Sequence, residues 1–293
     1  MMITEAAKNL SNEISEIIVL DPTENCPAAQ AGAKQIVGDF KDEDAIVKLA
    51  EQSDIITYEI ESGNTDVLSK VKAEIEPSPS TLGIIQDKLL QKTFLLENEL
   101  PISQFYKITS LDDLREKINE LGLPVLLKSR RDAYDGRGNY KISSLEEIEK
   151  AYQYFDGKSL MVEKFVDFKM EVSVIAVRNT KGEIAVYPLV ENIHEDNILK
   201  MTVAPARVSD DVINDAGEIA KKTMDVLKGA GVFGIEMFID QNDRILINEI
   251  APRVHNSGHH TLQSCRTSQF EQHLRAILGL ELGSTDLVHK TVM

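Results

Sequence analysis

The sequence predicts an α/β protein, and two observations support that class. In the first 80 residues, apolar runs typical of buried strands alternate with helical segments, which is the order of a parallel, Rossmann-like layer. Further along the chain, at residues 159–194 and 231–250, long strand-like runs rich in valine and isoleucine continue the pattern. A proline-containing stretch, residues 76–80, marks a domain boundary between the two parts.

The first part begins on a helix. Residues 1–12 predict an amphipathic helix, residues 16–21 a buried parallel strand, residues 41–52 a helix, and residues 54–62 another strand. The first strand of such a layer normally lies near its centre, and no strand precedes this helix. We therefore expect an incomplete layer with unpaired strand edges.

The second part mixes helices with a longer series of strands. The pattern predicts a helix at 84–99, a strand at 124–129, a polar glycine-containing loop at 130–140, a helix at 144–155, strands at 159–166, 170–179 and 183–194, a helix at 211–228, and strands at 231–240 and 244–250.

Composition narrows the classes of function. The 293 residues are 42% hydrophobic and carry a formal net charge of -16, which argues against a nucleic-acid-binding protein. An anionic substrate would need local lysine and arginine clusters or metal ions. Cys26 and Cys265 are too few for a disulfide framework and predict reduced thiols. With no apolar stretch near the roughly 18–20 residues of a membrane span and no signal peptide, we expect a cytoplasmic enzyme without a membrane partner.

Two glutamates in the last predicted strand pair are expected to face one another. If these strands form a hairpin around a two-residue turn at Asn242–Asp243, Glu236 lies opposite Glu249 on one face of the sheet. Facing carboxylates repel, and a divalent cation between them removes the penalty. Their oxygens, with that of Asn248, suit Mg²⁺. The alternative is a solvated hairpin whose glutamates face water.

A second group of residues has the chemistry of a nucleotide clamp. The YDGRG loop, residues 134–138, follows the strand that carries Lys128, and its glycines would let backbone N–H groups approach phosphate oxygens. A short turn between two strands would have the same sequence. Glu171 lies in an apolar strand and needs a partner such as a ribose hydroxyl or a lysine, unless it is an exposed edge residue.

The segment NEIAPRVHNSGHHT, residues 248–261, is the most specific in the chain. Together with YDGRG, EIE (residues 59–61), ENIHEDNI and SQFEQHLRAI, it resembles the ATP-grasp 5-(carboxyamino)imidazole ribonucleotide synthases, which also form the ATPase domain of phosphoribosylaminoimidazole carboxylases. The spacing of His255 and His259 would also fit a zinc site, but no third ligand with suitable spacing is near.

The resemblance implies an ATP-grasp fold at 81–280 after a truncated pre-ATP-grasp domain at 1–80, with 281–293 starting a further, missing domain. It also implies roles for individual residues. Those for ATP are Lys88, Lys128, Asp135, Gly136, Gly138, Glu163, Lys164, Phe165, Val166, Glu171 and His194, and those for Mg²⁺, or Mn²⁺ in its place, are Glu236, Asn248 and Glu249. Catalytic roles fall to Tyr134, Arg137, Arg253, His255 and Asn256. The last three, with Glu59 or Glu61, would bind bicarbonate and the aminoimidazole.

The implied reaction is ATP-dependent carboxylation of 5-aminoimidazole ribonucleotide by bicarbonate in purine (IMP) biosynthesis, by a ligase that forms a homodimer. In this mechanism Arg253 would orient the carboxyl group and His255 would move a proton. Three alternatives remain open. They are another ATP-grasp ligase, an ATP-binding fragment of a bifunctional carboxylase, and a non-catalytic ATP-binding remnant.

Overall fold

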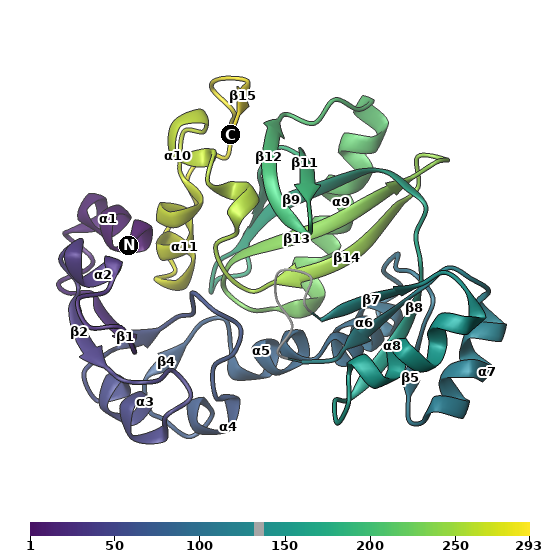
Figure 1. Cartoon of the computed structure of the whole chain (residues 1–293). Coiled ribbons are helices and arrows are strands. Elements are labelled where there is room, and N and C mark those ends of the chain that lie inside the picture. The colour runs from purple at the N-terminus through teal and green to yellow at the C-terminus, as the bar shows by residue number, and fades with distance from the viewer. Residues whose placement is uncertain (132–137) are drawn as a thin grey trace.

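A computed structural model describes residues 1–131 and 138–293. The chain folds into three parts (Figure 1). The N-terminal layer lies on the left of the view, a small four-stranded sheet lies at the lower right, and a seven-stranded sheet lies above them. Among the described residues, no helix combines the length and the apolar character needed to cross a bilayer.

The N-terminal layer has short strands in two separate parallel pairs. Its strands are β1 (Ile18–Asp21) with β2 (Lys34–Val37), and β3 (Ile55–Ile56) with β4 (Glu74–Ile75). Its helices are α1 (Met2–Ala7), η1 (Lys8–Leu10), α2 (Pro27–Gln30), α3 (Glu43–Ala50) and α4 (Thr65–Leu68). The strand predicted at 54–62 was wrong beyond its first residues. The carbonyl groups of Glu61 and Gly63 accept hydrogen bonds from the side chain of Gln86, and these replace a strand partner.

The predicted helix at 84–99 is two helices, α5 (Pro79–Gln86) and α6 (Lys88–Glu97). The break lies at Asp87, whose backbone is extended and whose carboxylate accepts hydrogen bonds from the backbone N–H groups of Leu89 and Leu90. Arg130 binds the same carboxylate through two nitrogens. Aspartate is a preferred N-cap because its oxygen satisfies the free N–H groups of the first turn. A new helix therefore begins here, with Lys88 at its first position.

The small sheet is antiparallel, in the order β5 (Phe105–Ile108), β8 (Leu160–Lys164), β6 (Val125–Ser129) and β7 (Asn139–Ile142). The helices α7 (Leu111–Leu121) and α8 (Ile148–Tyr154) share an apolar core with the sheet, and η2 (Leu145–Glu147) directly precedes α8. Ser144 and Glu147 form a capping box at the start of this last helical segment, which confirms the helix predicted at 144–155.

The large sheet has the order β14 (Ile245–Ala251), β13 (Gly231–Asp240), β9 (Phe168–Arg178), β11 (Val190–Glu195), β12 (Ile198–Ala204) and β15 (Thr291–Val292), with β10 (Ile184–Val186) also paired to β9. The strand predicted at 183–194 is thus split into two, around Pro188, which has no N–H to donate. Between β14 and β15 lie η3 (Asn256–Gly258), α10 (Thr261–Ser264) and α11 (Gln269–Ile277).

Side-chain alternation gives this sheet one apolar face and one mixed face. Val172, Val174 and Ala176 of β9 pack against α9 (Asp210–Leu227) with the odd-numbered residues of β13. The alternate residues point the other way, where α11 and α1 cover one end of the sheet. The uncovered remainder of that second face carries Glu171 and Glu236, because residues two apart in a strand share a face.

Candidate functional site

The glutamate pair lies where the sequence predicted it, although the loop was wrong. Glu236 is opposite Glu249 across β13 and β14. The loop, however, has three residues between Asp240 and Arg244, with Asp243 at a positive φ of 63°. A three-residue loop alone would shift the pairing by one position. A β-bulge compensates, because Met237 pairs with Ile247 and Asn248 is the extra residue.

The bulge directs two neighbouring side chains into the site. The amide nitrogen of Asn248 lies 3.4 Å from Glu236 Oε2, and Glu249 Oε1 lies 2.5 Å from Lys88 Nζ. In a regular strand adjacent residues would point to opposite faces. Burial opposes the charge on Lys88, but the nearby carboxylates outweigh that effect and raise its pKa. Burial also opposes ionisation of Glu236, yet His255, His194 and Lys88 lower its pKa to about 2.

Two residues that were not predicted from the sequence hold this bulge from outside. Gln91 of α6 donates to the carbonyl group of Ile250 at 3.2 Å and accepts from its N–H at 3.1 Å. Lys92 Nζ donates to the carbonyl group of Ile247 at 3.1 Å. Helix α6 therefore binds the outer edge of β14 on both sides of Asn248 and Glu249. A signal existed in the sequence, because polar residues occupy the buried face of this helix at the spacing where apolar residues are expected.

A buried ion cluster connects α6 to the small sheet. Glu163 Oε2 lies 3.3 Å from Lys128 Nζ and 3.7 Å from Lys92 Nζ, and Ser103 donates to it at 3.2 Å. Burial favours the neutral acid, but the two ammonium groups outweigh it and lower the pKa of Glu163. Glu163 Oε2 is thus paired with the lysines, whereas Glu163 Oε1 is buried and has no hydrogen-bond partner among the described residues.

The residues that follow Glu163 in the predicted ATP segment lie at the end of β8 and in the connection to β9. The ammonium group of Lys164 donates to the carbonyl group of Gly122 at 2.9 Å. The Phe165 ring lies beneath Lys141 Nζ, 3.9 Å from the ring centroid, and Val166 follows it. The side chains of Lys164 and Phe165 thus contact other residues of the small domain. The segment links the small sheet to the large sheet.

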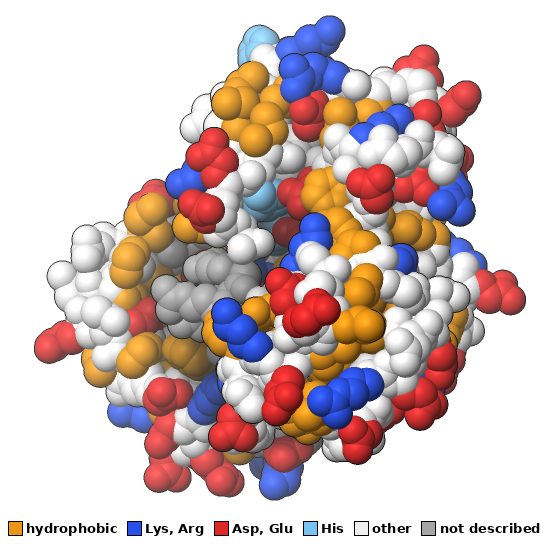
Figure 2. All heavy atoms as spheres, turned by 45° about the vertical axis from the view of Figure 1, so that its right-hand side comes forward, with side chains coloured by type: hydrophobic (Ala, Val, Ile, Leu, Met, Phe, Trp, Pro, Cys, Tyr) orange, Lys and Arg blue, Asp and Glu red, His pale blue; other side chains and the backbone are white. Residues whose placement is uncertain are grey.

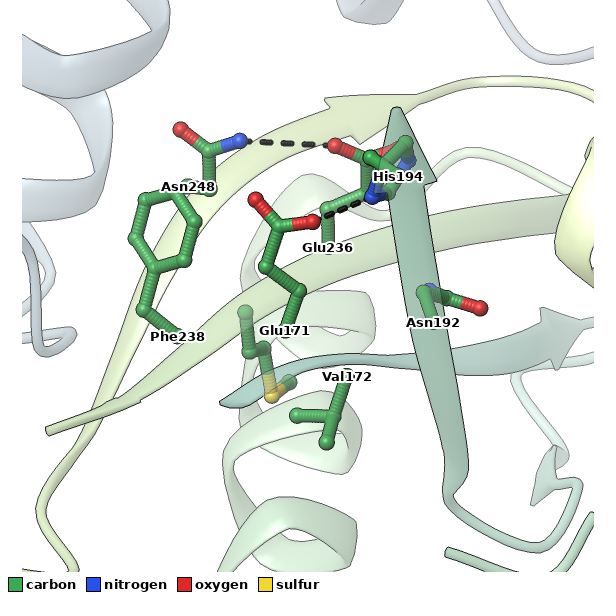
Figure 3. Close-up of a pocket in the computed structure, with 8 residues that line it drawn as sticks. Glu171, Val172, Asn192, His194, Glu236, Phe238 and Asn248 are labelled. Atoms are coloured by element: carbon green, nitrogen blue, oxygen red, sulfur yellow. Dashed lines mark hydrogen bonds and ion pairs between the residues drawn. The ribbon is translucent and has the colours of Figure 1, made fainter. Parts of the chain in front are cut away.

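Glu171 and His194 line one pocket beside the glutamate pair (Figure 3). The two side chains form an ion pair between β9 and β11, and this contact raises the pKa of His194. Figure 3 shows Phe238 and Asn248 bordering the same space. The partner of Glu171 in this structure is therefore His194, and not the lysine or ribose hydroxyl considered above. His194 itself was predicted separately to contact the nucleotide.

The segment after β14 brings Arg253 and His255 to the same region. Arg253 Nε lies 2.8 Å from Glu61 Oε1, whereas Glu59 Oε1 lies 4.0 Å from the N-terminal nitrogen. Of the two acids proposed for the substrate, the structure therefore places Glu61 beside Arg253. His255 Nε2 lies 3.3 Å from Glu236 Oε1, and Asn256 is exposed at the start of η3.

The two histidines considered for zinc point to different partners. His255 contacts Glu236, while the ring of His259 lies 5.6 Å from that of Phe270. Within residues 1–131 and 138–293, no group of three or more His, Cys, Asp or Glu side chains is arranged to hold a metal. Glu236, Asn248 and Glu249 include only two residues of those four types. All three offer oxygen atoms, whereas zinc sites are built mainly from histidine nitrogen and cysteine sulfur.

Tyr134, Asp135, Gly136 and Arg137 lie outside the described residues, and their predicted roles stay predictions. Gly138 is described, and its carbonyl group accepts a hydrogen bond from the Ser129 N–H at 2.9 Å. Figure 2 shows this side of the molecule hollowed between the two sheets, with histidine and acidic side chains at its depth. Lys88, Lys92 and Lys128 supply local positive charge there in a chain of net charge -16.

Comparisons with known proteins assign the family. An ATP-grasp domain model matches residues 93–270, and a ribonucleotide synthetase preATP-grasp domain model matches residues 1–86. The N5-carboxyaminoimidazole ribonucleotide synthase of Bacillus subtilis is 38% identical over 294 residues, which are 100% of this chain and 77% of that protein. The chain belongs to the N5-carboxyaminoimidazole ribonucleotide synthase family of ATP-grasp enzymes.

Solved structures of this synthase family have the same fold. That of the Aspergillus clavatus synthase in complex with ADP and 5-aminoimidazole ribonucleotide superposes with a TM-score of 0.93 at 38% identity, covering 99% of this chain and 77% of that one. The phosphoribosylaminoimidazole carboxylase of Candida albicans is 42% identical over 290 residues, 96% of this chain and 50% of that protein. The chain spans about half the length of such carboxylases. These matches confirm the predicted ATP-grasp fold after a pre-ATP-grasp domain.

Proposed function

We propose that the chain uses ATP, Mg²⁺ and bicarbonate to carboxylate 5-aminoimidazole ribonucleotide, forming N5-carboxyaminoimidazole ribonucleotide, ADP and phosphate in purine biosynthesis. One observation carries the proposal. In a chain of this family, the bulge in β14 directs Asn248 and Glu249 to the face that also holds Glu236. Arg253 borders the same region through the His255 segment. Oxygen ligands for a metal ion and the guanidinium group of Arg253, which could bind a carboxyl group, are therefore close together.

The donor set supports Mg²⁺ in this proposal. Glu236, Asn248 and Glu249 offer oxygens, which a hard cation prefers, and Mn²⁺ would accept the same ligands. The low pKa of Glu236 keeps it ionised at neutral pH, as a metal ligand must be. Bound there, Mg²⁺ would neutralise phosphate charge as the phosphoryl group is transferred.

The protein side chains position the reactants and offset their charge. A bicarbonate oxygen attacks the γ-phosphorus of ATP, which releases ADP and gives carboxyphosphate. The exocyclic amine then attacks the carboxyl carbon, phosphate leaves, and the amine loses a proton. In this scheme Lys88 and Lys128 contact phosphate oxygens, and Arg253 orients the carboxyl group. Glu61 contacts the aminoimidazole, which its place beside Arg253 supports.

Other residues complete the proposed site. Glu171 and His194 contact the nucleotide in the pocket of Figure 3, and Asn256 contacts the substrate. Tyr134 and Arg137 act on the carboxylating centre, with Asp135, Gly136 and Gly138 beside the phosphates. We also include a homodimer in the proposal. A cytoplasmic location is included as well, and free, buried Cys26 and Cys265 agree with it. Gel filtration of the purified chain tests the dimer.

The first test measures ADP release from the purified chain with Mg²⁺, ATP and bicarbonate, with and without aminoimidazole ribonucleotide. We expect the ribonucleotide to stimulate release. ATP binding without any ribonucleotide-dependent turnover would contradict the carboxylation proposal and favour an ATP-binding protein.

A substitution tests the role of the guanidinium separately. Arg253→Ala should abolish stimulation by the ribonucleotide while ATP binding is retained. Arg275→Ala is the matched control, because Arg275 lies in α11 and pairs with Glu271 at 2.8 Å. Normal carboxylation by Arg253→Ala would remove this residue from the mechanism.

A further inference from the structure

A row of buried polar side chains runs across β12, β11 and β9 of the large sheet to His255. Thr202 Oγ1 donates to Asn192 Oδ1 at 3.2 Å, and Asn192 Nδ2 donates to Ser173 Oγ at 2.8 Å. Ser173 Oγ donates to Ser257 Oγ at 2.7 Å, and Ser257 Oγ lies 2.9 Å from His255 Nδ1. The first four are no more than 5% exposed. Buried polar groups need partners, and each of these finds its partner in the next.

The direction of this row is set at its His255 end. Hydroxyl groups can donate in either direction, and an asparagine amide can be turned over, so the row alone allows two arrangements. The backbone N–H of Ser257 cannot reverse, and it points to His255 Nδ1 at 3.4 Å in the N-cap of η3. Nδ1 must therefore accept. With one proton on each hydroxyl group, every link then runs from Thr202 towards His255.

The ring of His255 is held so that it cannot exchange its two nitrogens. The side chain of Gln269 binds the backbone of His255 on both sides, accepting from its N–H at 2.9 Å and donating to its carbonyl group at 2.8 Å. The ring packs against Gly234, where an added Cβ would lie 2.5 Å from Cγ of the ring. Nε2 consequently faces Glu236.

We infer that the Thr202–Asn192–Ser173–Ser257 row keeps the proton of His255 on Nε2, so that His255 acts in the site as a hydrogen-bond donor to an anionic oxygen. This inference rests on the proposed function, because it specifies how His255 serves that site. It replaces the earlier expectation that His255 moves a proton. Thr202, Asn192, Ser173 and Ser257 are positioning residues, since they act through His255.

The test is the nitrogen NMR spectrum of the whole chain labelled with heavy nitrogen in histidine. The chain has six histidines, and the His255→Gln variant assigns the signal. In the neutral ring of His255 we expect a protonated Nε2 and an unprotonated Nδ1. A neutral ring with its proton on Nδ1 would overturn the inference. This readout needs no turnover, so it remains decisive if carboxylation itself is absent.

Variants test whether the row sets this state. Thr202→Val and Ser173→Ala should shift part of the His255 population to a protonated Nδ1 and lower kcat about tenfold, the lower end of effects seen when such supporting partners are removed. Thr202→Ser keeps the hydroxyl group and should restore both. Thr223→Val, which removes an equally buried hydroxyl group within α9, is the matched control. An unchanged His255 signal in both Thr202→Val and Ser173→Ala would refute the role of the row.

Discussion

Lys92 offers a sharp test of how the site is held together. Its side chain is buried, and its ammonium group both donates to the Ile247 carbonyl group and lies 3.7 Å from Glu163 Oε2. Lys92→Met keeps most of the volume and removes the charge and the donor. The carbonyl group that precedes the bulge loses its side-chain donor, and Glu163 keeps only Lys128 and Ser103 as partners.

The cost can be worked out from these contacts. Leaving a buried carbonyl group without its donor costs about 1–3 kcal/mol. Removing one partner of a buried ion pair costs about 3–5 kcal/mol when the remaining charge is uncompensated, and Lys128 compensates most of it here. Removal of the buried charge on Lys92 itself returns part of the loss. We therefore expect a decrease of about 2 kcal/mol in the free energy of unfolding near pH 7.

The pH dependence of the stability penalty gives a second, independent test of the role of Lys92. Burial is the main cause that lowers the pKa of Lys92 from 10.5 to about 8. Between these values the unfolded chain binds more protons than the folded chain, so this residue stabilises the fold increasingly as pH rises. A difference of that size corresponds to about 3 kcal/mol. The penalty of Lys92→Met should therefore grow from about pH 8 to about pH 10.5.

Urea unfolding followed by far-ultraviolet circular dichroism is a suitable assay, because the chain has no tryptophan. Lys221→Met is the matched control, since Lys221 is an exposed lysine of α9 that pairs with Glu218. The variant should also need more Mg²⁺ for ATP turnover, because the bulge that carries Asn248 and Glu249 is less firmly held. A penalty that stays constant or shrinks as pH rises would refute the reasoning.

Two further predictions concern the metal ligands and the packing of the histidine ring. Glu249→Gln should lower Mg²⁺-dependent ADP release at least tenfold and raise the Mg²⁺ concentration required, whereas Glu218→Gln on α9 should leave both unchanged; equal behaviour would exclude Glu249 as a ligand. Gly234→Ala should lower kcat about tenfold with only a modest loss of stability, because its Cβ would lie 2.5 Å from Cγ of His255 and force the ring aside. Gly217→Ala, in a helix with open space around it, is the control, and similar kinetics for the two alanine variants would contradict this account.

The sequence predicted the glutamate pair because alternation and complementary register are local properties. It could not predict how that pairing arises. A two-residue turn and a three-residue loop followed by a bulge give the same partner for Glu236, and only the second directs Asn248 and Glu249 to one side. The fold class was predictable for a similar reason, since strands and helices differ in their hydrophobic period.

Other features depend on contacts between distant segments. The break at Asp87 is stabilised by Arg130, which is 43 residues away in sequence. Gln91 and Lys92 bind a strand edge 155 or more residues further along the chain. Ser173 has the pattern of an ordinary strand residue, and only the fold brings Ser257 within hydrogen-bond distance of it. Periodicity shows that such polar residues face inward, but the partner that each one binds follows only from the tertiary fold.

The most direct test of the proposed carboxylation follows the oxygen of bicarbonate. The purified chain is given ATP, Mg²⁺, aminoimidazole ribonucleotide and bicarbonate labelled with heavy oxygen, and the phosphate released is analysed by mass. If bicarbonate attacks the γ-phosphorus, each phosphate should carry one labelled oxygen, in an amount equal to the ADP formed. Unlabelled phosphate would show that water attacks ATP instead and would contradict the carboxylation account.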